Sequence, residues 1–212
     1  MNKTQVSSPL AKRFRGFYPV VIDVETAGFD VKRNPLLEIA AVVLTMDGQG
    51  QLIPQETLQY HIKPFAGALC EQSALDFNGI KPHNPFRFAI SEYEALQQLF
   101  TAIHTQTKLH NCQRAIMVAH NPSFDQGFIH AAVKRCGIRT NPLHQFTSFD
   151  TATLGGLVFG QTVLARIVKM AGIDYAQEQA HSAKYDAHIT AQLFCYIVNK
   201  WSDMGGWPLS SD

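Results

Sequence analysis

Asp23 and Glu25 are the first residues whose types and spacing suggest chemistry. They interrupt an apolar segment, Val21 to Val24, although acidic residues are depleted in strands. Positions i and i+2 of a strand point the same way, so both carboxylates lie side by side near its end. Such neighbours repel each other unless a cation neutralises them, and Mg²⁺ takes oxygen ligands. The pair therefore indicates a divalent metal site, and the alternative is a strand that ends in solvent.

A third acid, Asp125, follows the apolar segment Ala115–Ala119 and falls in the first turn of a helix expected from Ser123. In open α/β sheets, ligands bind in the crevice at the carboxyl ends of the strands. Asp125 is thus a candidate metal ligand. An acid in the first turn is also favoured by the helix dipole alone, so the simpler interpretation stays open.

Asp186 and His181 lie at the start of the last expected helix. Each alone is compatible with an ordinary surface position. Together, however, four acids from separated segments can converge on one crevice and supply oxygens for two cations. Two such ions stabilise the attacking and leaving oxygens of a phosphodiester displacement. His181 precedes the helix on an expected loop, and a histidine of ordinary pKa is suited to take a proton from the attacking water.

An α/β fold in one domain, residues 1–212, is predicted to position these groups. Three strands with short connections, turned once at Asp47-Gly48, predict an antiparallel meander. These strands are Pro19–Val24, Leu36–Met46 and Thr57–Ile62. Strand and helix then alternate, which indicates one mixed sheet with helices on its faces. This second part comprises a helix at Ser91–Thr105 with a Ser91/Glu94 capping pattern, a strand at Ala115–Ala119, a helix at Ser123–Cys136 closed by Gly137, a short strand at Gln145–Phe149, two helices within 151–172, and a helix at Ala183–Trp201.

The composition agrees with a globular chain. It has 212 residues, 46% of them hydrophobic, with a net charge of +1, so it can bury a core and carries no global field that would attract nucleic acid. Residues 1–16 are basic and are expected to form a mobile or docking arm. We expect no membrane span and no secretory signal, because no apolar run is long enough. Four widely spaced cysteines show no metal-binding pattern and favour free thiols in a reducing cytoplasm: Cys70, Cys112, Cys136 and Cys195.

The acids and the histidine resemble the three motifs of the DEDDh exonucleases, which belong to the proofreading-exonuclease superfamily. His181 stands five positions before Asp186, whereas the tyrosine branch has Tyr at the position of Ser182 here. Longer segments resemble the ribonuclease T family over about residues 13 to 209. They include FRGFYPVVIDVETAGF, LLEIA, DFNGI, SEYEAL, RAIMVAHN, FDTA, GQTVL, AHSA and GGWPLS.

The resemblance implies a ribonuclease H-like mixed five-stranded sheet and a Mg²⁺-dependent 3′→5′ exoribonuclease, with Mn²⁺ as a possible substitute. Such an enzyme trims the 3′ ends of tRNA and other stable RNAs, releases nucleoside 5′-monophosphates and also degrades single-stranded DNA. By the same resemblance, Asp23, Glu25, Asp125 and Asp186 bind two metal ions, and His181 is the general base. The alternatives are a DNA proofreading or repair exonuclease and a non-catalytic module that binds RNA ends.

Phenylalanine accounts for 14 of the 22 aromatic residues. A ring without a polar group stacks on any base, which gives affinity with little sequence discrimination, although each ring could equally belong to the core. The resemblance implies that four of them grip the 3′-terminal bases: Phe29, Phe77, Phe124 and Phe146. Ser73 stands where the family has a glutamate that disfavours 3′-terminal cytosine, so we expect weaker discrimination against that base.

Basic residues form two groups, at 12–15 and at 108–139, where phosphates could bind. A solvated helix face explains Lys134 and Arg135 equally well. The resemblance implies a homodimer in which this patch of one subunit serves the active site of the other. The residues concerned are Arg13, Arg15, Lys108, Arg114 and Arg139.

Overall fold

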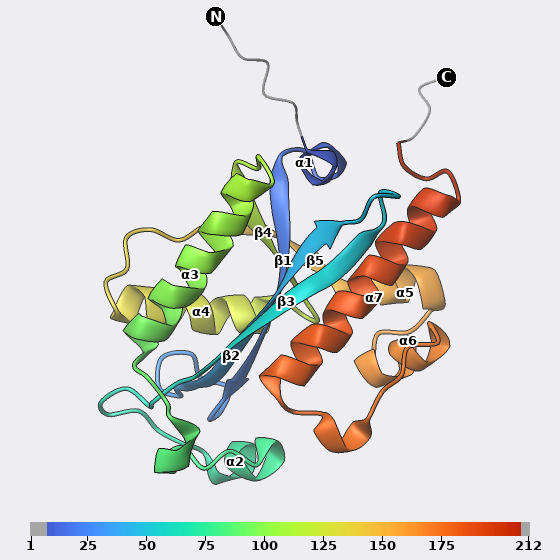
Figure 1. Cartoon of the computed structure of the whole chain (residues 1–212). Coiled ribbons are helices and arrows are strands. Elements are labelled where there is room, and N and C mark those ends of the chain that lie inside the picture. The colour runs from blue at the N-terminus through green and yellow to red at the C-terminus, as the bar shows by residue number, and fades with distance from the viewer. Residues whose placement is uncertain (1–7, 209–212) are drawn as a thin grey trace, which may run out of the picture.

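The computed structural model describes residues 8–208, and its strands form one five-stranded sheet in the order β3-β2-β1-β4-β5 (Figure 1). β1, β2 and β3 are antiparallel, and β4 and β5 run parallel to β1. The predicted meander followed by parallel strands is therefore confirmed. The strands are β1 (Phe17–Thr26), β2 (Leu36–Met46), β3 (Leu52–His61), β4 (Arg114–Ala119) and β5 (Leu143–Asp150).

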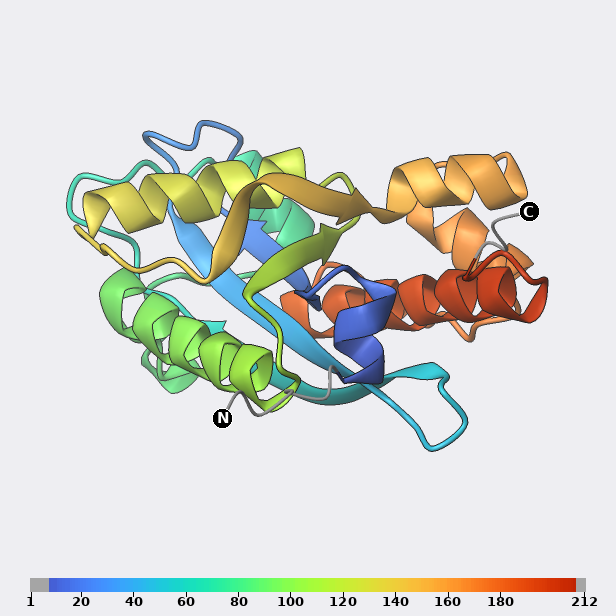
Figure 2. The same ribbon diagram turned by 90° about the horizontal axis from the view of Figure 1, so that it is seen from above.

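Helices cover both faces of the sheet. In Figure 1, α3 and α7 lie in front of the sheet and α4 lies behind it, while Figure 2 shows α5 and α6 beside α7, beyond β5. The helices are α1 (Pro9–Arg13), α2 (Gln72–Asn78), α3 (Glu92–Leu109), α4 (Ser123–Arg135), α5 (Thr151–Phe159), α6 (Leu164–Met170) and α7 (Ala183–Asp203), with short 3₁₀ turns η1 (Pro85–Arg87) and η2 (Gln177–Gln179).

β1 occupies the centre of the sheet because its side chains are apolar on both faces. Val20, Val21 and Ile22 are almost fully buried, as expected of a strand that is covered on both sides. The segment continues as a strand to Thr26, beyond the Val24 end that was expected. Asp23 and Glu25 thus belong to a regular strand and not to a solvated strand end.

The local signals in the sequence account for several helix ends. Ser91 and Glu94 form the expected capping box at the start of α3, which satisfies two backbone N–H groups that the helix leaves free. Gly137, just after α4, adopts a φ of +64°, a conformation that glycine takes at little cost.

β3 begins at Leu52, five residues before the predicted start. Asp47 accepts hydrogen bonds from the N–H groups of Gln49 and Gln51, and this turn brings Leu52 opposite Met46. Pro54 argues against a strand here when the sequence is considered alone. β3 is, however, an edge strand, where proline is tolerated.

Residues 9–13 correct the prediction of a mobile or docking arm over residues 1–16. They form α1, whose Ser8 side chain caps the first turn. Leu10 is 1% exposed and joins the main core, so burial of apolar surface fixes this part of the segment. Residues 1–7 lie outside the described residues.

α5 and α6 are apolar because they pack on the core. Ile167 and Val168 of α6 form a second buried cluster with Ile189, Leu193 and Ile197 of α7. Within residues 8–208 no single helix has the length and apolar composition to cross a membrane, and only α5 and α6 taken together, with a bend of 46°, meet that test.

Tyr18 provides a test of how β1 is joined to β2. Its buried hydroxyl donates to Leu44 O (2.9 Å) and accepts from Leu44 N (3.0 Å). Tyr18→Phe removes both bonds and leaves two buried backbone groups unpaired, so we expect the free energy of unfolding to fall by about 1–3 kcal/mol. Urea denaturation measures this loss, with Tyr93→Phe at a half-exposed position as the control. Equal stability of the two variants would contradict the role of Tyr18.

Candidate active site

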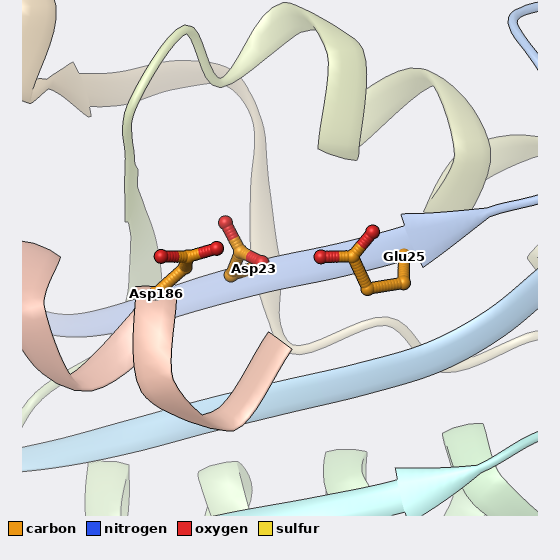
Figure 3. Close-up of side chains that lie close together, drawn as sticks. All are labelled: Asp23, Glu25 and Asp186. Atoms are coloured by element: carbon orange, nitrogen blue, oxygen red, sulfur yellow. The ribbon is translucent and has the colours of Figure 1, made fainter. Parts of the chain in front are cut away.

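Three carboxylates meet where β1 passes the start of α7. Asp23 and Glu25 project from the same face of β1, and Asp186 comes from the first turn of α7 (Figure 3). One oxygen from each side chain lies within 4.8 Å of the others. The structure therefore brings together three acids that are separated by up to 163 positions in the chain (186 minus 23).

Burial raises the pKa values of all three acids, and repulsion between carboxylates adds to the effect at Asp23 and Glu25. Burial raises the pKa of Asp23, and the charges of Asp125, Glu25 and Asp186 raise it further. Burial, with Asp186 and Glu38, raises the pKa of Glu25 to about 8, and burial also raises the pKa of Asp186. The group is thus unstable as bare anions at neutral pH. Its donors are all carboxylate oxygens, so it fits a hard divalent cation.

Asp125 lies beside this group but is not one of the three. Its Oδ1 accepts a hydrogen bond from Val24 N at 3.1 Å. β4 pairs with β1 only as far as Val21. The Asp125 side chain therefore accepts the Val24 N–H at a point of β1 where β4 no longer provides a partner. Burial raises the pKa of Asp125 to about 7. Its role as a metal ligand stays a prediction.

His181 lies on a loop before α7, as expected. Its backbone N–H donates to Asp186 Oδ2 (2.9 Å), and its φ is +67°. The exposed ring lies 4.0 Å, centroid to centroid, from the ring of Phe77 on α2. Asp186 therefore fixes the backbone of His181 next to the carboxylates, while the imidazole faces the helix opposite.

Three of the four candidate stacking rings line one pocket next to Glu25. Phe29, Phe77 and Phe124 line a pocket of about 360 Å³ together with Ser73. The exposed Phe29 ring lies 6.0 Å from that of Phe124. Phe146 is not among the described residues that line this pocket. It lies on edge strand β5 and is 82% exposed.

Gly28 allows the loop that carries Phe29 to close. It adopts a φ of +146°, and a Cβ at this position would come within 2.4 Å of Asn34 Oδ1. The buried Asn34 side chain accepts from Asp30 N and donates to Leu69 O. On the other side of Phe29, the Thr26 hydroxyl donates to Gly28 O. The backbone is therefore tied before and after Phe29, while the ring itself remains exposed.

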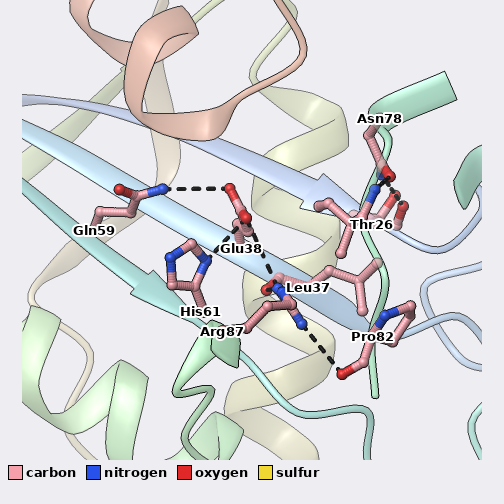
Figure 4. A network of polar contacts seen from close by, with 9 residues as sticks. Thr26, Leu37, Glu38, Gln59, His61, Asn78, Pro82 and Arg87 are labelled. Carbon is pink, nitrogen blue, oxygen red and sulfur yellow. Dashed lines mark hydrogen bonds and ion pairs between the residues drawn. The ribbon is translucent and has the colours of Figure 1, made fainter. Parts of the chain in front are cut away.

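Asn78 and Glu38 are site residues that the sequence analysis missed. Asn78 of α2 donates to Thr26 O and holds the end of β1 (Figure 4). Glu38 of β2 pairs with Glu25 across the sheet and lies within 2.9 Å of His61 Nδ1 and 3.8 Å of Arg87. A signal for Glu38 existed, since it is an acid within an apolar strand, as Asp23 is.

The five candidate phosphate-binding residues lie elsewhere. Arg15 stacks over Phe17 of β1, and Phe17 lies opposite Arg114 of β4. Phe17 precedes Asp23 by six residues, which corresponds to about 20 Å along the strand. Arg114 and Arg139 line a common hollow of about 500 Å³, Lys108 is exposed at the end of α3, and Arg13 stacks over Trp207. The structure does not bring this patch to the carboxylates of the same chain.

Comparisons with known proteins decide the family. The exonuclease family model matches residues 20–194. Ribonuclease T of Photorhabdus laumondii is 54% identical over 211 residues, covering 100% of this chain and 97% of the relative. Ribonuclease T of Escherichia coli K12 is 56% identical over 202 residues, covering 95% and 94%. The chain belongs to the ribonuclease T family. It is therefore a hydrolytic 3′→5′ exonuclease that cleaves phosphodiester bonds, as the motifs predicted.

Solved structures support the fold that is expected of the ribonuclease T family. E. coli exonuclease I in complex with a dT13 oligonucleotide superposes with a TM-score of 0.68 at 15% identity, covering 90% of this chain and 43% of that chain. The zinc-bound exonuclease I complex with single-stranded DNA gives a TM-score of 0.69 at 16% identity, covering 90% and 42%. The chain thus spans less than half of exonuclease I, and the likeness confirms the ribonuclease H-like sheet alone.

Metal binding can be measured without any substrate. We expect Mg²⁺ at about a hundred-fold excess over its Kd to raise the Tm of EDTA-treated protein by about 5–10 °C. Asp186→Asn should lose this shift, whereas Asp203→Asn, at an exposed position of the same helix, should keep it. Differential scanning fluorimetry makes the measurement, and an equal shift in both variants would remove Asp186 from the site.

The same experiment has a defined pH dependence. A carboxyl whose pKa is higher in the folded than in the unfolded chain stabilises at low pH, and this contribution is lost as pH rises through the folded value, here about 8 for Glu25. The protein without metal should therefore lose stability as the pH approaches 8. Protons compete with the cation, so the Mg²⁺ shift should shrink as pH falls below that value. A shift that grows at lower pH would contradict this.

Proposed function

We propose that the chain is a Mg²⁺-dependent exoribonuclease that trims the 3′ ends of tRNA and other stable RNAs. It releases nucleoside 5′-monophosphates and also acts on single-stranded DNA. The observation that carries the proposal is the position of the three-carboxylate group directly beside a pocket lined by phenylalanine rings. A nucleotide whose base fills this pocket has its phosphate close to Asp23 and Glu25.

Asp23, Glu25, Asp125 and Asp186 would hold two Mg²⁺ ions, with Mn²⁺ as a substitute. Bound divalent cations lower the barrier by stabilising negative charge on the attacking and leaving oxygens. The protein contributes the fixed spacing of the acids. β1 holds Asp23 and Glu25 in register, and the first turn of α7 places Asp186 against them.

His181 is the proposed general base, which takes the proton of the attacking water. A histidine can serve this role near neutral pH because its ordinary pKa lies there. Its backbone is tied to Asp186 but its ring lies on an exposed loop against Phe77. We infer that the ring turns from Phe77 toward the phosphate when a 3′ end is bound, so that catalysis follows correct seating.

Phe29, Phe77 and Phe124 are proposed to stack on the terminal bases, with Phe146 contacting the strand outside the pocket. Stacking contributes about 1–3 kcal/mol per base and tolerates any sequence. Ser73 lines the same pocket and offers a small hydroxyl in place of a carboxylate. Discrimination against 3′-terminal cytosine should therefore be weak.

The basic patch is proposed to bind the phosphates of RNA that occupies the active site of a second copy, in a homodimer. Its distance from the carboxylates of its own chain supports this, because one short 3′ overhang cannot contact both. The patch comprises Arg13, Arg15, Lys108, Arg114 and Arg139.

We place the enzyme in the reducing cytoplasm, a proposal that the four free cysteines support.

A labelled RNA hairpin tests the proposed function. The hairpin carries a single-stranded 3′ overhang, and the phosphate that links its last two nucleotides is radioactive. It should release labelled nucleoside 5′-monophosphate in Mg²⁺ and none in EDTA. Asp23→Asn should lose nearly all turnover but keep its affinity for the overhang, because the stacking pocket is intact. Asp203→Asn is the matched control. Release in EDTA, or unchanged turnover by Asp23→Asn, would reject the proposed chemistry.

Ser73→Glu tests the specificity of the pocket. We expect this variant to slow the release of 3′-terminal cytosine relative to adenine by about ten-fold, the size of one charge-assisted contact. Ser73→Gln has the same shape without the charge and should show a smaller change. Competition between overhangs that end in C and in A measures the ratio. Equal ratios for Ser73→Glu and the unaltered protein would show that this position does not set base preference.

A further inference from the structure

Two phenylalanines outside the proposed active site are almost fully exposed. Phe86 is 81% and Phe88 is 83% exposed, which makes them as exposed as Phe29, at 82%. They flank Arg87 at η1, between α2 and α3. A soluble domain gains nothing for its stability from rings so placed, and contiguous apolar surface of this kind commonly marks a binding site.

Phe88 also lines a hollow of about 510 Å³. Lys63 and His83 line the same hollow, together with three prolines, Pro64, Pro82 and Pro85. None of the described residues that line it is acidic. An aromatic ring, apolar walls and a lysine side chain are a combination that can bind single-stranded nucleic acid through base stacking and phosphate contacts.

The charge of the surrounding segment points to the same class of ligand. Residues 79–90 carry Lys81, His83 and Arg87 and contain no acid. Glu94 lies near Lys63, but its carboxylate accepts hydrogen bonds from Ser91 N and Oγ in the capping box. Arg87 is turned inward, toward Glu38, so Lys81 and Lys63 are the cations that this surface offers to a phosphate backbone.

Arg87 joins this surface to the active site. Its guanidinium donates to Leu37 O (2.7 Å) and to Pro82 O (3.4 Å) and lies 3.8 Å from Glu38 Oε1 (Figure 4). Glu38 is the cross-strand partner of Glu25. Phe86 and Phe88 thus flank a residue that is fixed to β2 at Leu37 and Glu38, next to Glu25. Asn78, the last residue of α2, ties that helix to the end of β1 through Thr26 O.

We propose that Phe86, Phe88, Lys63, Lys81 and His83 form a second binding site for the single-stranded part of the substrate, a few nucleotides before the 3′ end. This site, which we call the 81–88 platform, rests on the proposed function because its ligand is the same strand. Phe86 and Phe88 stack on bases, and the basic side chains contact phosphates. The platform acts on strands long enough to reach it and does not contribute to the chemical step.

Variants of the two rings test the platform by substrate length. Phe86→Ala combined with Phe88→Asn removes both rings, and asparagine tolerates the left-handed backbone of residue 88, whose φ is +50°. With a single-stranded dodecanucleotide we expect KM to rise about ten-fold with kcat unchanged, whereas with a trinucleotide both stay within about two-fold. Phe86→Tyr should behave as the unaltered protein, and Met170→Ala is the control for loss of an exposed apolar side chain.

Salt dependence tests the basic part of the platform. Lys63→Ala with Lys81→Ala should reduce the slope of log KM against log salt for the dodecanucleotide and leave that for the trinucleotide unchanged. If the KM of the variant that lacks both rings rises equally for the dodecanucleotide and the trinucleotide, or for neither, the platform is overturned. RNA and DNA strands are run in parallel. If the unaltered protein digests DNA but not RNA, the proposed RNA substrate fails, while the platform is still decided by the length dependence on DNA.

Discussion

Repulsion among half-buried carboxylates is the constraint on which the structure depends. Burial raises the pKa values of Asp23, Glu25 and Asp186, and the charges of neighbouring carboxylates raise those of Asp23 and Glu25 further. A hydrophobic core gains no stability from such a group, because a charge that is removed from water and left unpaired costs free energy. The acids are tolerated because the surrounding strands and α7 are rigid, and because a cation turns the repulsion into binding energy.

The fold supplies this rigidity from elements that are distant in sequence. At Asp23 and Glu25, β1 is paired with β2, opposite Ala40 and Glu38, so this pairing keeps the two acids side by side. Asp125 binds the backbone of Val24 where β4 has ended. Asp186, in the first turn of α7, accepts a hydrogen bond from the backbone N–H of His181. Asp125 and Asp186 therefore also tie down the backbone around the site, so replacing either one would disturb local structure as well as the carboxylate group.

Patterns with strong periodicity could be predicted, whereas features set by tertiary contacts could not. The apolar runs of β1 and β2, the capping box of α3 and the apolar stripe of α7 are local signals, and the elements followed them. α2 buries none of its residues, so it had no apolar stripe to reveal it, although it carries Phe77 and Asn78. Convergence of Asp23 with Asp186 was expected by analogy with known motifs, but the approach of Arg87 to Glu38 depends on strand pairing that no spacing discloses.

In the proposed function, the two ends of the sheet contact different parts of the bound strand. The carboxylates, the ring-lined pocket and the 81–88 platform lie on elements joined through β1, β2 and α2, while the arginine patch lies at the start of β1 and β4. A base in the pocket is bounded by Phe29, Phe77 and Phe124, next to Glu25. The pocket, of about 360 Å³, borders Glu25 directly, so a base stacked there would place its own phosphate beside the carboxylates. In the proposed function, the rings therefore hold the same nucleotide that is cleaved at the carboxylates.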